Sequence, residues 1–274
     1  PLYARLNQSD QDRVFRPSGA RRIVLATNVA ETSLTVPNIR YVVDSGLARV
    51  KRYRYRGKVE QLQIEPIPQA QANQRSGRCG RIANGICIRL YDEAEFKQRP
   101  EFADPEIHRS ALAAVMLRMK SLGLPEIRDF PFIDPPSGKA VADGLVMLRE
   151  LNAIDGDGRL TAIGKTLAKF PVDPRIGRML VASRQLGCLK EMLVIAAALS
   201  TQDPRDRPEA QASIADRAHA AFADPASEFS SLLNLWNRIQ SLHGARESNR
   251  KYDQALRAQF LSPLRVREWR EIHQ

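Results

Sequence analysis

Cysteine and histidine are scarce in this sequence of 274 residues, which contains three cysteines and four histidines. The cysteines, Cys79, Cys87 and Cys188, are odd in number and lack the paired spacing that binds zinc. We therefore expect reduced thiols and no metal site. No apolar run is long enough to cross a membrane, and the first residues lack the layout of a secretion signal. These absences predict a cytoplasmic protein.

Basic residues are in excess, with 42 Lys and Arg against 31 Asp and Glu, which gives a formal net charge of +11. Such an excess favours a polyanionic partner, although net charge alone produces only nonspecific attraction. The content of 43% hydrophobic and 27% charged residues is typical of a globular protein. The length predicts two or three domains.

The basic residues are concentrated in residues 49–58, which hold six of them with two tyrosines around Gly57. This pattern predicts a β-hairpin whose arginines bind phosphates and whose rings stack on bases. Its candidate nucleic-acid-binding residues are Arg52, Arg54 and Arg56. The alternative is a solvated edge hairpin whose charges only prevent aggregation.

A segment rich in arginine and glycine has the sequence Gln74-Arg75-Ser76-Gly77-Arg78-Cys79-Gly80-Arg81. On one helical turn, Arg78 and Arg81 would face the same way and could bind a polyphosphate together. Gly77 and Gly80 would let a ligand approach the backbone, and Gln74 could orient a water molecule. A solvated helix face or a generic RNA-binding segment remains the alternative.

An upstream segment alternates apolar runs with polar residues. The run 23–26 precedes the polar residues Thr27, Asn28 and Ser33, and a second run, Tyr41-Val42-Val43, ends in Asp44. The two runs predict buried parallel strands, whose carboxyl ends carry ligand loops in open α/β sheets. Alternatively, the polar residues serve only in turns and helix caps.

Together the two segments resemble motifs V and VI of the DEAH-box helicases of superfamily 2. Motif V of that family has the pattern found in Thr27-Asn28 and Ala30-Glu31-Thr32-Ser33, and motif VI has the pattern of residues 74–81. The resemblance extends through almost the whole chain, and residues 264–269 look more like the bacterial members than the eukaryotic splicing members.

The resemblance implies an α/β plus mainly α fold. We expect an incomplete RecA-like parallel sheet with a β-hairpin at residues 1–97, a winged helix at 98–165 and a helical bundle, similar to the ratchet domain of the family, at 166–274. The helix before the arginine motif is expected over 69–78.

The resemblance also implies an ATP-dependent RNA helicase, with ATP bound between two RecA-like domains. Gln74 would position the attacking water, and Arg78 and Arg81 would contact the γ-phosphate. The expected nucleotide-binding residues are Phe15 against the adenine, Ser33 as a nucleotide sensor, Thr35 near the ribose, and Gly77. Thr27 and Asn28 match positions that contact the RNA backbone.

The phosphate-loop pattern Gly-x-x-x-x-Gly-Lys-Ser/Thr does not occur in the sequence. We therefore expect a fragment that lacks the first RecA-like domain, which would hold most Mg²⁺ ligands, and we expect the isolated chain not to hydrolyse ATP. Its partners would be RNA and the remaining domains of the polypeptide. A nonenzymatic RNA-binding or partner-binding module and a DNA-directed helicase remain alternatives.

Overall fold

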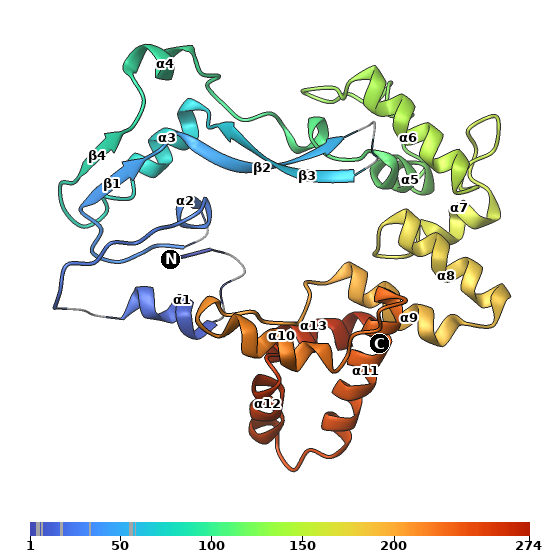
Figure 1. Cartoon of the computed structure of the whole chain (residues 1–274). Helices are drawn as coiled ribbons and strands as arrows, with labels where there is room; N and C mark the ends of the chain where they lie inside the picture. Colours follow the sequence, from blue (N-terminus) through green and yellow to red (C-terminus); the bar gives the residue numbers. More distant parts are fainter. Residues whose placement is uncertain (4–5, 7, 17–18, 33, 55–56, 58) are drawn as a thin grey trace. The chain divides into compact units, whose positions relative to one another are not determined.

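A computed structural model of the chain describes residues 1–3, 6, 8–16, 19–32, 34–54, 57 and 59–274 (Figure 1). The chain divides into two compact units. The first unit contains Pro1–Leu112 and Pro131–Asp143, and the second contains Ala113–Phe130 and Gly144–Gln274. In the described parts of the chain, no helix combines the length and the apolar character needed to span a membrane.

The first unit contains two small sheets and several short helices. Its elements are α1 (Gln8–Phe15), α2 (Val29–Thr32), β1 (Tyr41–Asp44), β2 (Leu47–Arg54), β3 (Val59–Pro66), α3 (Gln69–Ser76), β4 (Ile86–Arg89), α4 (Glu93–Gln98) and a 3-10 turn, η1 (Glu106–His108). Strands β1 and β4 are parallel, and β2 and β3 form an antiparallel hairpin. The expected incomplete parallel sheet with a hairpin is confirmed. The second apolar run forms β1 as predicted, but the prediction that it is buried is wrong, because Tyr41 is 68% exposed and Val43 is 64% exposed.

The prediction of a buried strand at residues 23–26 is wrong. Among the described residues, this segment pairs only with Leu2, through a bridge at Ala26 and a 2.7 Å hydrogen bond from the Leu2 N–H to the Leu25 carbonyl. Ile23 is 81% exposed and Leu25 is 72% exposed. An apolar run becomes a buried parallel strand only where neighbouring strands and covering layers enclose it. The described residues provide neither here.

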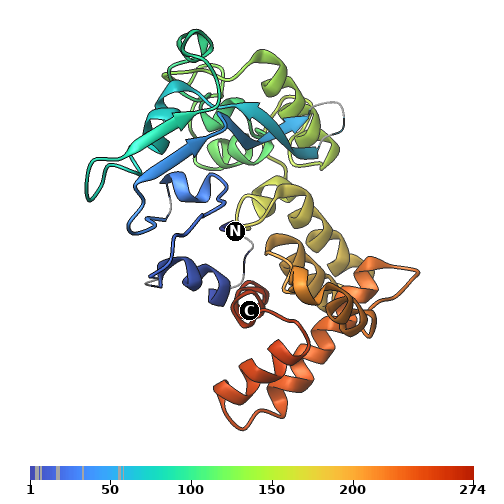
Figure 2. The same ribbon diagram turned by 60° about the vertical axis from the view of Figure 1, so that its left-hand side comes forward.

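The second unit is helical (Figure 2). Its elements are α5 (Ala113–Ser121), α6 (Gly138–Glu150, which begins in the first unit), α7 (Ala162–Leu167), α8 (Pro174–Leu186), α9 (Leu189–Ser200), the 3-10 turn η2 (Glu209–Gln211), α10 (Ala212–Ala220), α11 (Glu228–Gly244), α12 (Asn249–Ala258) and α13 (Pro263–His273). The expected winged helix and helical bundle are confirmed.

Short polar side chains determine where several of these helices begin. The Thr161 hydroxyl accepts a hydrogen bond from the Gly164 N–H at 3.0 Å, and the Asp173 carboxylate accepts one from the Arg175 N–H at 2.8 Å. Each satisfies a backbone donor that has no partner within its helix. Helix α8 ends at Gly187, whose φ of +74° favours glycine.

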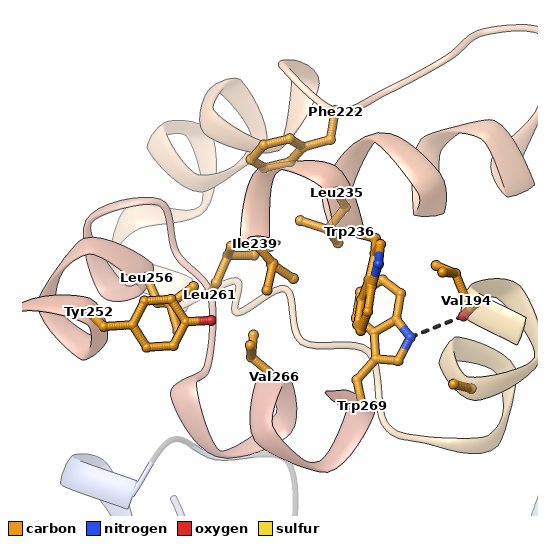
Figure 3. Close-up of a cluster of buried hydrophobic side chains, with 11 residues drawn as sticks. Val194, Phe222, Leu235, Trp236, Ile239, Tyr252, Leu256, Leu261, Val266 and Trp269 are labelled. Atoms are coloured by element: carbon orange, nitrogen blue, oxygen red, sulfur yellow. Dashed lines mark hydrogen bonds between the residues drawn. The ribbon is translucent and has the colours of Figure 1, made fainter. Parts of the chain in front are cut away.

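The core of the second unit lies among α9, α11, α12 and α13 (Figure 3). Trp236 and Trp269 lie side by side, with ring centroids 5.1 Å apart. The Trp269 indole N–H donates to the Val194 carbonyl at 3.1 Å, so the buried ring also satisfies its polar atom. The buried cluster comprises Val194, Ala197, Phe222, Leu235, Trp236, Ile239, Tyr252, Leu256, Leu261, Val266 and Trp269.

Candidate functional site

The arginine motif follows the end of α3. Gly77 caps the helix with φ −61° and ψ −14°, and the Arg78 N–H turns back to the Arg75 carbonyl at 3.0 Å. The prediction that the helix extends to residue 78, and that Arg78 and Arg81 share a helical turn, is therefore wrong. Beyond the helix, Gly85 packs on the Cys79 carbonyl so closely that a Cβ at Gly85 would overlap it.

The two candidate arginines nevertheless reach the same segment of the first unit, residues 31–35. The Arg78 Nη2 donates to the main-chain carbonyl of Glu31. The Arg81 Nη1 donates to the Thr35 hydroxyl at 2.5 Å. The structure thus brings Arg78, Arg81 and Thr35 together although more than forty residues separate the two segments along the chain.

The Arg78 guanidinium has an unsatisfied donor. Among the described residues, its enclosed Nη1 finds no hydrogen-bond acceptor. Burial, and then the positive charge of Arg81, lower the pKa of Arg78. Leaving a guanidinium donor unpaired in the protein interior costs free energy, and a bound anion is one way to satisfy it. An anion placed near both arginines would satisfy the donor and offset their repulsion.

A buried ion-pair network supports these residues, and the sequence analysis missed it. Arg75 on α3 donates from Nε to Glu31 at 2.9 Å and from Nη1 to Asp44 at 2.7 Å. Glu31 is 5% exposed and Asp44 2%. The sequence signals for this network were an arginine, Arg75, next to Gln74 and a carboxylate, Asp44, directly after an apolar run. Nothing in the sequence indicates that these two residues form an ion pair.

Asp44 is the most enclosed member of this network. It also accepts hydrogen bonds from the Gly46 N–H at 3.0 Å and from the Tyr91 hydroxyl at 2.9 Å. Burial raises the pKa of Asp44, but hydrogen bonds from Gly46, Arg75 and Tyr91 together outweigh it, so the pKa lies below its ordinary value. Asp44 therefore remains an anion at neutral pH, opposite the Arg75 cation.

The other predicted nucleotide residues lie at different levels of exposure. Gln74 is exposed on α3, and Phe15 is half-buried as the last residue of α1. Gly77 is exposed, and a Cβ there would approach its nearest neighbouring atom at 3.4 Å, which is ordinary contact. Glycine at this position is therefore not required by packing. Ser33 lies outside the described residues.

The predicted RNA-binding residues divide between motif V and the hairpin. Thr27 and Asn28 are exposed immediately before α2. On the hairpin, Arg52 donates to Glu65 at 2.8 and 2.9 Å and to Asp104 at 2.8 Å. A phosphate contact at Arg52 would have to compete with these two carboxylates. Arg54 is exposed, and Arg56 lies outside the described residues.

In the described ranges, no group of three or more His, Cys, Asp or Glu side chains is placed to hold a metal ion.

Comparison with known families identifies three successive domains. Residues 1–83 match the helicase conserved C-terminal domain. Residues 144–172 match the winged-helix part of the helicase-associated domain HA2, and residues 173–263 match its ratchet-like part. The order of the three matches is the order that the sequence analysis expected.

Curated relatives cover the chain from end to end. It is 51% identical over 278 residues to the ATP-dependent RNA helicase HrpA of Escherichia coli and 50% identical over 280 residues to an HrpA homolog of Haemophilus influenzae, in each case over 100% of this chain. The splicing helicase prp22 of Schizosaccharomyces pombe is 40% identical over 239 residues, or 86% of the chain. The chain spans 21% of the length of the two bacterial proteins and 20% of prp22.

Proposed function

We propose that this chain, which belongs to the DEAH-box helicase family, is part of an ATP-dependent RNA helicase. In that enzyme it would supply one wall of the ATP site. Supporting this proposal, the relatives that match the whole chain are named as ATP-dependent RNA helicases. ATP would bind between this first unit, as part of the second RecA-like domain, and the first RecA-like domain of the full-length protein. The enzyme would couple ATP hydrolysis to translocation on RNA and unwinding.

The observation that carries the proposal is the docking of Arg78 and Arg81 on residues 31–35, with an enclosed Nη1 of Arg78 that lacks an acceptor. In the closed site, both guanidinium groups would bind the γ-phosphate and stabilise the charge that develops during phosphoryl transfer. Gln74, exposed on α3, would orient the attacking water.

The remaining nucleotide contacts are proposed from the family resemblance. Phe15 would stack on the adenine, Ser33 would sense the nucleotide state, and Gly77 would let the phosphates approach the backbone. Thr35 would lie near the ribose. Because the Thr35 hydroxyl accepts a hydrogen bond from Arg81, ribose binding and arginine placement would be linked at this residue.

RNA would be held through its sugar-phosphate backbone, so that contact does not depend on sequence. We propose Thr27, Asn28, Arg54 and Arg56 as contacts. Arg52 would act with them only if phosphate displaced its carboxylate partners. The RecA-like part would cover residues 1–97, the winged helix 98–165 and the helical bundle 166–274.

Mg²⁺, which would accompany ATP, has no cluster of acidic ligands among the described residues. We propose that its ligands lie mainly on the other RecA-like domain. Since the sequence also lacks a phosphate-loop pattern, we propose that these 274 residues alone do not hydrolyse ATP. We propose that the enzyme is cytoplasmic.

The test is Arg81→Lys in the full-length enzyme, measured as RNA-stimulated ATP turnover. Lysine keeps the charge but loses the planar guanidinium. We expect turnover to fall about a thousandfold, the scale of an arginine finger, while RNA affinity is retained. Arg207→Lys is the control, because Arg207 pairs with Asp216 on the surface of the second unit. An unchanged turnover number in Arg81→Lys would refute the proposed role.

A further inference from the structure

Arg75 connects three elements of the first unit through one guanidinium group. It lies in the last turn of α3 and pairs with Glu31 on α2 and with Asp44 at the end of β1. Its Nη1 also donates to the Leu47 carbonyl at 3.1 Å. Acceptors from three different parts of the chain therefore fix the position of the Arg75 side chain.

The segment that Arg75 holds is the one on which the two phosphate-binding arginines are docked. Arg75 binds the side chain of Glu31, and Arg78 binds the main-chain carbonyl of the same residue. Arg81 then binds the hydroxyl of Thr35. A displacement of Glu31 would therefore move the acceptor of Arg78 directly.

The Asp44 end of the network is rigid. Gly46, which donates to Asp44, has φ +71°, and a Cβ on it would come within 2.6 Å of the Tyr91 ring. Arg99 covers the same ring, 3.9 Å from its centroid, and donates to the Gly46 carbonyl at 2.9 Å. Because Asp44 is enclosed in this way, it provides a fixed anchor from which Arg75 can position Glu31.

We propose that Arg75 is a positioning residue for phosphoryl transfer: by bridging Asp44 and Glu31, it holds Glu31 where Arg78 docks. This inference rests on the proposed function, because it assigns to Arg75 the placement of a group proposed to bind the γ-phosphate. Small misplacements of catalytic groups lower rates strongly, and supporting residues prevent such misplacements. Arg75 itself need not touch ATP.

The experiment compares Arg75→Lys and Glu31→Gln with the unmodified full-length enzyme. Lysine keeps a positive charge but cannot bridge two carboxylates with a planar group, and glutamine keeps the shape of Glu31 without its charge. We expect kcat for RNA-stimulated ATP hydrolysis to fall at least about tenfold in both variants. RNA affinity is expected to stay within about threefold, since no proposed RNA contact is altered.

Arg89→Lys is the matched control. Arg89 also binds α3, through the Asn73 side chain at 2.8 Å, and it lies over the Phe96 ring, but its contacts do not include residues 31–35. We expect kcat to be unchanged. A second control separates positioning from folding: Arg75→Lys combined with Arg78→Ala should be no slower than Arg78→Ala alone, because Arg75 acts through Arg78.

The outcomes distinguish this inference from the proposed function. If Arg78→Ala lowers turnover but Arg75→Lys does not change kcat, the positioning role is overturned and the helicase proposal stands. If the effects of Arg75→Lys and Arg78→Ala on kcat are additive in the double variant, and the loss of kcat is accompanied by a lower Tm, Arg75 has only a structural role. If Arg78→Ala turns over ATP normally, the proposed function fails and the positioning role fails with it.

Discussion

Asp44 is a carboxylate that remains charged although it is almost fully buried. Burial alone would raise its pKa, and the three donors Gly46, Arg75 and Tyr91 reverse that effect. The sequence analysis placed Asp44 correctly at the end of an apolar run but assigned it no partner. Arg75 was likewise visible within the arginine motif, yet its role depends on residues 31 and 44, which the sequence cannot bring near it.

The lowered pKa of Asp44 predicts an acid-sensitive first unit. A group whose folded pKa is depressed contributes stability above its unfolded pKa and loses it as the pH falls through the folded value. We therefore expect hydrogen-exchange protection of the Gly46 amide, which donates to Asp44, to be constant near neutral pH. It should fall as the pH drops below about 4, the unfolded value for Asp.

The matched variant for this prediction is Asp44→Asn, which cannot ionise. Protection should be lower at neutral pH, because Arg75 loses a charged partner, and it should change much less with acid. Amides of the second unit provide an internal reference. Equal acid sensitivity of the Gly46 amide in both proteins would contradict the assignment.

At the scale of elements, the predictions made from local sequence patterns were reliable, whereas the prediction of which segments are buried was not. The β2–β3 hairpin was predicted from residues close together in the chain, and the structure has it. The run 23–26 looked like a buried strand because its residues are apolar, yet it is exposed. Whether an apolar run is buried depends on neighbours far away in the sequence, which its composition does not reveal.

The end of α3 gives a prediction for the loop that carries the arginines. At Gly85, an added Cβ would overlap the Cys79 carbonyl, whereas at Gly80 the nearest atom to such a Cβ lies 4.0 Å away. We expect Gly85→Ala to destabilise the first unit by about 1–3 kcal/mol, the range for overpacking. Gly80→Ala is the matched control and should change the unfolding free energy by less than about 0.5 kcal/mol.

Hydrogen exchange of residues 77–89 would measure this difference within the first unit. The loop should lose protection in Gly85→Ala and keep it in Gly80→Ala. Similar protection in both variants would mean that the close approach of Gly85 to Cys79 does not determine the path of the loop.

At the scale of the whole molecule, the two units are stabilised in different ways. The first unit has buried ion pairs that join short elements, while the second has a large apolar cluster. Both tryptophans belong to that core, so intrinsic tryptophan fluorescence reports on the second unit alone. This separation allows the stability of each unit to be measured in the same protein.

Trp269→Phe tests the core of the second unit. The change removes the hydrogen bond to the Val194 carbonyl and shrinks a ring that is fully buried. We expect a loss of about 1–3 kcal/mol in unfolding free energy, measured by urea denaturation with Trp236 fluorescence. Phe229→Leu, at an exposed position of α11, should have little effect. An unchanged midpoint in Trp269→Phe would exclude Trp269 as a main element of this core.

The sequence by itself determined the family, the order of its domains, the hairpin and the helical character of the second unit. These features depend on motifs, caps and periodicities that act within a few residues of the chain. Only the tertiary structure decided that Arg78 and Arg81 leave the helix and dock on residues 31–35, and that Arg75 bridges Glu31 and Asp44. Burial and ion pairing depend on which distant segments meet, and that is a property of the folded chain.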